Sequence, residues 1–530
     1  MKIDFLLMSE IGVLPELFLG ISIIYLLLHS TFLSIRTNYP LIQSSVIFLG
    51  SLTLFLAFYL LLNDSLNILG LTYFNDTIIN DYLSFIVKSS IVVLAFFCLL
   101  TIKNYLISQQ LNNFEYVLLI LFSVLGLFLL CSSNDLITAY LSIELQSLSF
   151  YVLASFKKNS SFSVDAGIKY FIVGALSSSL FLFGASFLYC STGTVCFSDF
   201  NFLFAESYYS IVPMTWYEFV GFSFMFVVNG GSLRELHYSF GEFDLFQLGL
   251  ALILISLLLK LAVAPFHIWA PNVYENSPSS STFFFAVVPK LAIFVLLTRI
   301  FYFSFNSHID NFRDPIAIIA ILTVIVGSFG GLEQRKLKSL LVYSSISHMG
   351  YSLISFSAGT FESIQILFCY LIIYSFSGLC IWTIFISTQL KSSYFQKQNK
   401  DLTDLVSLSK SNNTLSLIFT VVLFSVAGFP PMIGFLVKIS VFLTAIEVYM
   451  FFVALICILC SVIGTFYYIR IVKILFFEKT LSGKLFHPIN YINSTLIAFL
   501  FYFFIFLFVN PTLLFLFSYK LSLLSMGLGT

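Results

Sequence analysis

Charged side chains are scarce in this sequence. Only 9% of its 530 residues are Asp, Glu, Lys or Arg, against about 25% in an ordinary soluble domain. Hydrophobic residues make up 59% of the chain, and its mean hydropathy is +1.00. The composition therefore indicates an integral membrane protein through most of its length. We expect no nucleic-acid partner.

Motifs that hold energy-supplying cofactors are also lacking. The sequence has no Gly-Lys-Ser/Thr phosphate loop, no histidine pair with haem spacing and no cysteine set for an iron–sulfur cluster. Its one close cysteine pair, Cys457 and Cys460, lies in an apolar segment without His or Cys neighbours, which favours packing over metal binding. No soluble stretch is long enough for a nucleotide site. We expect that this chain binds no cofactor or metal itself, and that partner subunits supply any redox or ATP energy.

Apolar runs of bilayer length follow one another along the chain. A crossing needs about 20 apolar residues, so the sequence predicts an all-α, polytopic membrane protein with about fourteen transmembrane helices. The predicted segments are residues 11–35, 43–63, 82–102, 114–132, 135–156, 167–192, 245–270, 281–304, 315–330, 338–358, 362–390, 413–446, 447–470 and 492–517. The N-terminus has no cleavable signal pattern, since Asp4 and Glu10 precede the first apolar run.

Basic residues of the loops gather on one face of this topology. The richer face carries fifteen of them: Arg36, Lys103, Lys157, Lys158, Arg335, Lys336, Lys338, Lys391, Lys397, Lys400, Lys410, Arg470, Lys473, Lys479 and Lys484. The other face carries only Lys2, Arg234, Arg313 and Lys520. The positive-inside rule predicts that the richer face is cytoplasmic or matrix and that both termini lie opposite.

The remaining six basic residues lie inside predicted segments. Three can be explained by snorkelling to the surface: Lys88, Lys169 and Arg299. The other three are too deep for that: Lys260, Lys290 and Lys438. A lysine in hydrocarbon costs several kcal/mol and is by default a functional hypothesis.

Glu144 is the acidic residue nearest the middle of its segment, whereas Glu16 and others fall near segment ends. A nearby cation would keep the Glu144 carboxyl ionised, and burial alone would neutralise it. The deep lysines are candidate partners, and the sequence does not choose among them. Because a moving charge or proton nearby can switch the charge of a buried lysine, this set of residues predicts a proton relay.

Prolines interrupt two of these segments. Pro265 follows Lys260 and should free the carbonyl of residue 261, and Pro430 and Pro431 precede Lys438 and should free the carbonyls of residues 426 and 427. Two Gly/Pro-broken segments point to an ion pathway in transporters, although each kink could merely improve packing. His267 and His348 could each pass protons or serve only as hydrogen-bonding residues in the bundle.

Seven stretches then carry a resemblance. They span roughly residues 114–478 and read IELQSLSFYVLASF, DAGIKYFIVGALSS, LKLAVAPFHIWAPNVYENSP, VVPKLAIF, RKLKSLLVYSSISHMGY, VAGFPPMIGFLVK and SVIGTFYYIRIVKILFF. Together they resemble the subunit 2 family of mitochondrial NADH:ubiquinone oxidoreductase, respiratory complex I, of the full-length plant or protist type. The chain departs from the family pattern at Asn272 and Asn276, where the family usually has Asp and Gly.

The resemblance implies an antiporter-like fold with two discontinuous helices, and proton translocation coupled to electron transfer from NADH to ubiquinone. The relay would comprise Glu144, Lys260, Lys290, His348 and Lys438, with His267 weaker. The family arrangement implies one integral membrane domain over 1–530: a three-helix part (1–112), an antiporter-like core (113–478, with an insert at 193–244), and a C-terminal loop and last helix (479–530).

The resemblance also implies a setting. NADH, FMN, iron–sulfur clusters and ubiquinone would be handled by partner subunits. Those partners would include antiporter-like subunit 4 and small core subunits on the quinone side, with membrane lipid around them. The expected location is the mitochondrial inner membrane, with both termini on the intermembrane-space side, while a plastid or bacterial origin stays open. A subunit of a multi-subunit cation/proton antiporter and a purely structural scaffold are the alternatives.

Overall fold

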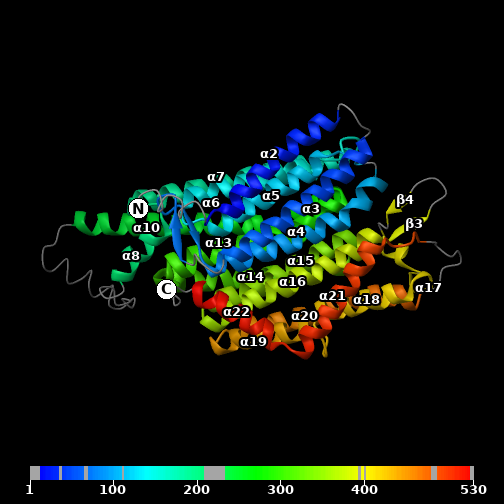
Figure 1. Ribbon diagram of the computed structural model, residues 1–530. Helices are drawn as coiled ribbons and strands as arrows, with labels where there is room; N and C mark the ends of the chain where they lie inside the picture. The colour runs from blue at the N-terminus through cyan, green and yellow to red at the C-terminus, as the bar shows by residue number, and fades with distance from the viewer. Residues whose placement is uncertain are drawn as a thin grey trace.

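Long α-helices run side by side through most of the molecule, as Figure 1 shows. The structure is a computed structural model that describes residues 12–34, 39–64, 70–109, 111, 113–207, 233–391, 396–398, 401–406, 408–478 and 486–525. Two short antiparallel hairpins accompany the helices. One pairs β1 (Leu71–Tyr73) with β2 (Ile78–Asn80), and the other pairs β3 (Gln389–Lys391) with β4 (Gln396–Gln398).

The helices follow in three groups. The first is α2 (Leu14–Ser34), α3 (Tyr39–Asp64) and α4 (Tyr82–Ser108). The second is α5 (Glu115–Ser132), α6 (Leu136–Ala154), α7 (Ser161–Thr192), α8 (Phe197–Ser207), α10 (Leu233–Leu261), α11 (Trp269–Asn276), α12 (Ser279–Val287), α13 (Pro289–Thr298) and the π-helix η1 (Arg299–Ser304). The third is η2 (Asn306–His308), α14 (Ile309–Leu332), α15 (Leu337–Ala358), α16 (Phe361–Ser387), η3 (Leu402–Leu405), α17 (Leu408–Ser411), α18 (Asn413–Ala427), α19 (Ile433–Glu447), α20 (Phe451–Phe476), α21 (Tyr491–Val509) and α22 (Thr512–Ser525).

The predicted all-α membrane fold is confirmed. Within the described residues, eleven helices are long and apolar enough to cross a bilayer, and shorter apolar helices cover 245–261, 413–427 and 512–523. The serine-rich α15 has 22 residues and lies at the tenth predicted crossing. Of the predicted insert 193–244, α8 and the start of α10 are seen, and residues 208–232 lie outside the described residues.

Helix α10 ends at Leu261, directly after Lys260. Ala262 has a left-handed backbone (φ 57°), and its N–H and that of Val263 each donate to a carbonyl of the last turn at 3.2 Å. These two bonds form a Schellman cap. The helix is thus interrupted at residue 261, where the prediction put the break, but Pro265 is not the residue that ends it. The left-handed residue ends the helix first, and the proline lies in the loop beyond it.

The second break repeats this pattern. Gly428 after α18 has φ 89°, and its N–H and that of Phe429 each donate to the Phe424 carbonyl at 3.0 Å. In both breaks the residue three positions after the left-handed one is a proline, Pro265 or Pro431. Such a repeated break is what an internal structural repeat would produce.

Close helix pairs build the core around these breaks. Helices α14 and α15 pack extensively, as do α7 and α10. Small residues allow the approach: a Cβ on Gly327 would lie 2.5 Å from the Ser347 backbone nitrogen, and one on Gly184 would lie 2.7 Å from the Gly249 carbonyl oxygen. Because apolar burial gives little driving force between helices in lipid, such close contacts stabilise the bundle.

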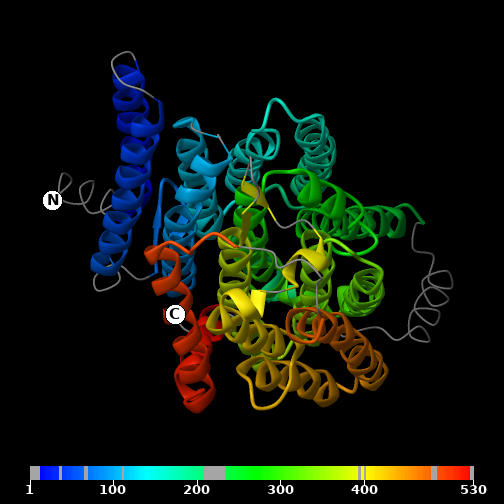
Figure 2. The same cartoon turned by 90° about the vertical axis from the view of Figure 1, so that its right-hand side faces the viewer.

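The N-terminal helices stand at one edge of the bundle, in dark blue in Figure 2, with the last helices in red near them. Helix α22 packs against both α4 and α16. The first and last helices therefore lie on the same side of the core. The division of the chain at residues 112 and 478 stays a prediction.

Two residues that we expected to snorkel are buried in ion pairs. Lys88 pairs with Glu16 and also donates to the Asn80 side chain at 3.0 Å, while Arg299 pairs with Asp81 at 2.7 Å. Lys88 and Arg299 are 2% and 6% exposed, so the snorkelling prediction is wrong for both. The partners lie 72 and 218 residues apart in the chain, so no helical spacing could reveal them. Lys169 on α7, the third residue expected to snorkel, is exposed.

Candidate functional site

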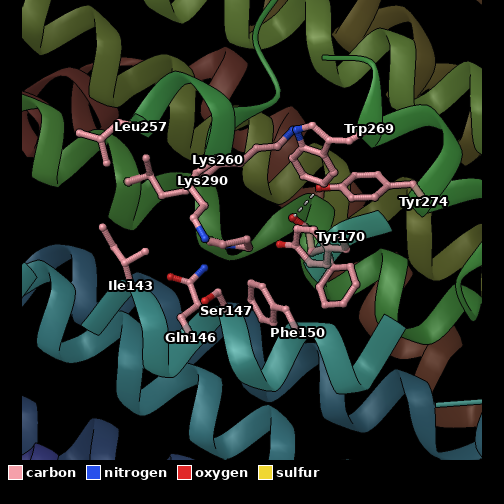
Figure 3. Close-up of a pocket in the computed structure, with 13 residues that line it drawn as sticks. Ile143, Gln146, Ser147, Phe150, Tyr170, Leu257, Lys260, Trp269, Tyr274 and Lys290 are labelled. Carbon is pink, nitrogen blue, oxygen red and sulfur yellow. Dashed lines mark hydrogen bonds between the residues drawn. The ribbon is translucent and has the colours of Figure 1, made fainter. Parts of the chain in front are cut away.

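Lys260 and Lys290 line the same internal cavity. Figure 3 shows both lysines in this cavity, with Gln146 and Ser147 of α6 across from them. The cavity leaves about 30 Å³ for the centres of water molecules, and one water needs about 10–15 Å³. The space therefore suits about two waters between polar side chains, and is too small for an organic cofactor.

The Lys260 ammonium is buried and, within the described residues, makes no hydrogen bond. Lys260 lies in the last turn of α10, where the carbonyl end of the helix favours a positive charge. The break that follows is held by Trp269, whose indole N–H donates to the Leu259 carbonyl at 3.1 Å. The local sequence thus places a lysine at a helix end inside the membrane and leaves its head free of a fixed partner.

Glu144 lies on α6, one turn from the cavity wall formed by Ser147. The Ser147 hydroxyl lies 3.4 Å from a Glu144 carboxylate oxygen, and Ser147 lines the cavity that Lys260 and Lys290 also line. The structure therefore places Glu144 beside the cavity that Lys260 and Lys290 share.

Lys290 follows Pro289 at the start of α13, where the proline interrupts the run from α12. Its ammonium donates to the hydroxyl of Tyr374 on α16 at 2.9 Å. Because Lys290 is only 6% exposed, little water reaches its ammonium. The neutral Tyr374 oxygen therefore largely fixes the position of the ammonium. Sequence reasoning did not foresee this third interruption, although Pro289 directly before a deep lysine is its signal.

Lys438 lines a second cavity with His348 and Tyr374. Its ammonium reaches back across the second break and donates to the Ala427 carbonyl at 2.8 Å. The expected free carbonyl of residue 427 is thus present, and the lysine itself occupies it. A Cβ on Gly428 would lie 2.9 Å from the Lys438 Cδ, so the glycine provides both the left-handed turn and the room for this lysine.

His348 on α15 lies among tyrosines. Its Nδ1 is 2.5 Å from the Tyr370 hydroxyl, its Nε2 is 3.4 Å from the Tyr468 hydroxyl, and its ring lies 5.3 Å from that of Tyr374. The histidine therefore belongs to the second cavity, which leaves about 20 Å³ for water centres.

His267 is placed differently. It lies in the loop between α10 and α11 and is half-buried, and it is absent from the linings of both cavities. His267 lies seven residues after Lys260 in the sequence, a spacing that would put both on one helical face only if α10 continued through Pro265, and the helix ends before that residue. His267 is thus the one predicted site residue that the structure leaves apart from the others.

The tyrosines are the residues that sequence reasoning missed. Tyr370, Tyr374 and Ser377 all line the second cavity, and their spacing of i, i+4 and i+7 puts them on one face of α16. A polar stripe at helical spacing within an apolar segment could have revealed them. No group of His, Cys, Asp and Glu among the described residues could hold a metal ion.

Comparison with known proteins places this geometry in a family. The family model described as "NADH:quinone oxidoreductase/Mrp antiporter, TM" matches residues 133–464. NADH-ubiquinone oxidoreductase chain 2 of Marchantia polymorpha is 34% identical over 516 residues, which cover 97% of this chain and 98% of that protein.

Two solved structures share the fold. A chain of respiratory complex I from Thermus thermophilus is 24% identical with a TM-score of 0.72, covering 94% of this chain and 98% of that chain. A chain of the Mrp complex from Dietzia sp. DQ12-45-1b is 16% identical with a TM-score of 0.75, covering 98% of each chain. The fold therefore does not separate the respiratory and antiporter subunits, whereas the sequence likeness does favour the former. The chain belongs to the NADH:quinone oxidoreductase/Mrp antiporter membrane family, and the resemblance predicted from its motifs is confirmed.

Proposed function

We propose that this chain is a membrane-arm core subunit of respiratory complex I that moves protons along Glu144, Lys260, Lys290 and Lys438. It would act as part of an NADH:ubiquinone reductase that translocates protons, with no redox centre of its own. The observation that carries the relay is the arrangement of two cavities. Lys260 and Lys290 line one cavity, Lys438 lines the other, and the Lys290–Tyr374 hydrogen bond lies between them.

Neutral surroundings support a relay for a physical reason. The hydrogen-bond partners of Lys290 and Lys438 are a hydroxyl and a carbonyl. When such a lysine loses its proton, no buried carboxylate is left without a counter-ion, so the change of charge is less costly than at a buried ion pair. His348 would help to hydrate or relay in the second cavity, and His267 has the weakest support.

The same proposal covers the setting. NADH, FMN, iron–sulfur clusters and ubiquinone would be handled by partner subunits. Antiporter-like subunit 4 and small core subunits would flank this chain, and membrane lipid would cover its apolar outer faces. The location would be the mitochondrial inner membrane, with both termini on the intermembrane-space side because of the loop charges. We also propose the division into 1–112, 113–478 and 479–530.

A double variant tests the relay. Lys260→Met with Lys438→Met removes two charges of the line, and we expect fewer protons pumped per electron in vesicles that contain the assembled complex. If the chain were instead a subunit of a cation/proton antiporter, the complex that contains it would not oxidise NADH. A scaffold would lose assembled complex and keep its pumping ratio. Normal pumping per electron in the assembled double variant would overturn the relay.

A further inference from the structure

The structure assigns a further relay residue, which rests on the proposed function: the Tyr374 hydroxyl passes the proton between the two cavities. Tyr374 is on α16, and this helix packs against both α13, which carries Lys290, and α19, which carries Lys438. Its hydroxyl accepts from Lys290 at 2.9 Å, while its side chain lines the cavity of Lys438.

No other hydrogen bond links the two cavity linings within the part of the chain that the structure describes. Lys290 belongs to the first lining and Tyr374 to the second. Among the tyrosines of the second cavity, Tyr370 is turned to His348, with its hydroxyl 2.5 Å from Nδ1. A proton that leaves Lys290 toward Lys438 therefore meets the Tyr374 oxygen first.

A phenol hydroxyl suits this position because it accepts through its oxygen and donates its own hydrogen at the same time. In the transfer, an Nζ–H bond of Lys290 breaks and a new Oη–H bond forms on Tyr374. The original Oη–H bond breaks, and its proton passes to a water in the second cavity. That cavity leaves about 20 Å³ for water centres, which is room for about one water.

The remaining step balances the charge. The water passes its extra proton to Lys438 when that lysine is a neutral amine, and an Nζ–H bond forms there. Tyr374 ends as a neutral phenol, Lys290 ends as a neutral amine, and one proton has moved from Lys290 to Lys438. The hydroxyl then rotates back to accept from Lys290 again. A phenylalanine ring of the same shape cannot do this.

The test is Tyr374→Phe in the assembled complex, with Lys290→Met as reference and Tyr302→Phe as matched control. Tyr302 is also buried, and its hydroxyl donates to the Phe356 carbonyl, away from both cavities. The measurements are protons pumped per electron in vesicles and the amount of assembled complex. We expect Tyr374→Phe to lower the proton ratio as much as Lys290→Met does, and Tyr302→Phe to leave it at the wild-type value.

The outcomes separate the two proposals. A normal ratio in Tyr374→Phe with a lowered ratio in Lys290→Met overturns the role of Tyr374 alone. A normal ratio in both variants overturns the lysine relay as well. If Tyr374→Phe does not assemble, Tyr374→His keeps a group that accepts and donates a proton. Its ratio should exceed that of Lys290→Met, and an equal ratio would overturn the assignment.

Discussion

Two regions of this molecule bury positive charges, and they do so in opposite ways. At the N-terminal edge, Lys88 and Arg299 each contact a carboxylate, from Glu16 and Asp81. In the central cavities, Lys290 and Lys438 contact a hydroxyl and a carbonyl instead. In the N-terminal region each positive charge is neutralised by a carboxylate, whereas in the cavities each lysine contacts an uncharged oxygen.

This difference separates structural from functional charges. In a buried ion pair, a change of protonation on one partner leaves the other uncompensated, so both stay charged. A lysine bonded to a neutral oxygen carries no such constraint. The Asp81–Arg299 pair also links the start of α4 to η1, directly after the helix that carries Lys290. We infer that the ion pairs hold the N-terminal helices to one another and to the core while the lysines carry the chemistry.

The largest effect should come from Lys88→Met. It leaves the Glu16 carboxylate, 5% exposed, without its counter-ion, and breaking a buried pair in this way costs about 3–5 kcal/mol. We expect little of the subunit to enter the assembled complex, as measured on native gels. Lys290→Met is the matched control, because it removes a buried lysine without leaving a carboxylate alone, and it should assemble.

The comparison also predicts a rescue. Lys88→Met combined with Glu16→Met replaces the whole pair by apolar side chains of similar volume, which is often neutral for stability. Assembly of the double variant should return close to the wild-type level, with normal pumping per electron. A single Lys88→Met that assembles normally but pumps poorly would contradict the structural role and move Lys88 into the functional set.

An intermediate effect is expected for Gly428→Ala. The left-handed backbone costs a non-glycine residue about 1–2 kcal/mol, and the new Cβ would lie 2.9 Å from the Lys438 Cδ. The lysine head should lose its bond to the Ala427 carbonyl, so both thermal stability and pumping per electron should fall.

Gly193→Ala is the control for that variant. Gly193 also has a left-handed backbone, at φ 76°, but a Cβ there would meet no atom within 4 Å. It should lose only the part of the stability that comes from the left-handed backbone, and it should keep its pumping ratio. If Gly428→Ala and Gly193→Ala pump the same number of protons per electron, the position of the Lys438 ammonium does not limit pumping.

Sequence reasoning predicted the helical membrane fold because apolar runs of bilayer length are a local signal. It also found the deep lysines, since Lys260, Lys290 and Lys438 lie far from any predicted segment end. Local spacing could not show which charges are paired. Glu16 lies near a predicted segment end, where a carboxylate needs no partner, and only the fold shows that it pairs with Lys88.

The helix breaks show the same limit at shorter range. Pro265 marked the right loop, but the helix end depends on the left-handed Ala262, and alanine carries no sequence signal for that backbone. At the second break, Gly428 does carry the signal, because glycine is the residue that such a turn favours. Both breaks were therefore located correctly, at Leu261 and Ala427, but only the second shows in its sequence how the helix ends.

The smallest effect, of opposite sign, should come from Ala262→Gly, which makes the first break resemble the second. Glycine removes the left-handed cost of about 1–2 kcal/mol, and the greater freedom of the unfolded chain takes back roughly 0.4–1 kcal/mol. We expect a gain in stability of at most about 1.6 kcal/mol, read as slower thermal inactivation of the assembled complex. Pumping per electron should not change, since Lys260 keeps its place in the last turn of α10. A loss of stability would show that the buried Ala262 methyl, in a residue 6% exposed, packs well enough to outweigh its strained backbone. In that case the two breaks would have the same backbone conformation, with the first stabilised by packing of the Ala262 methyl and the second by the conformational freedom of Gly428.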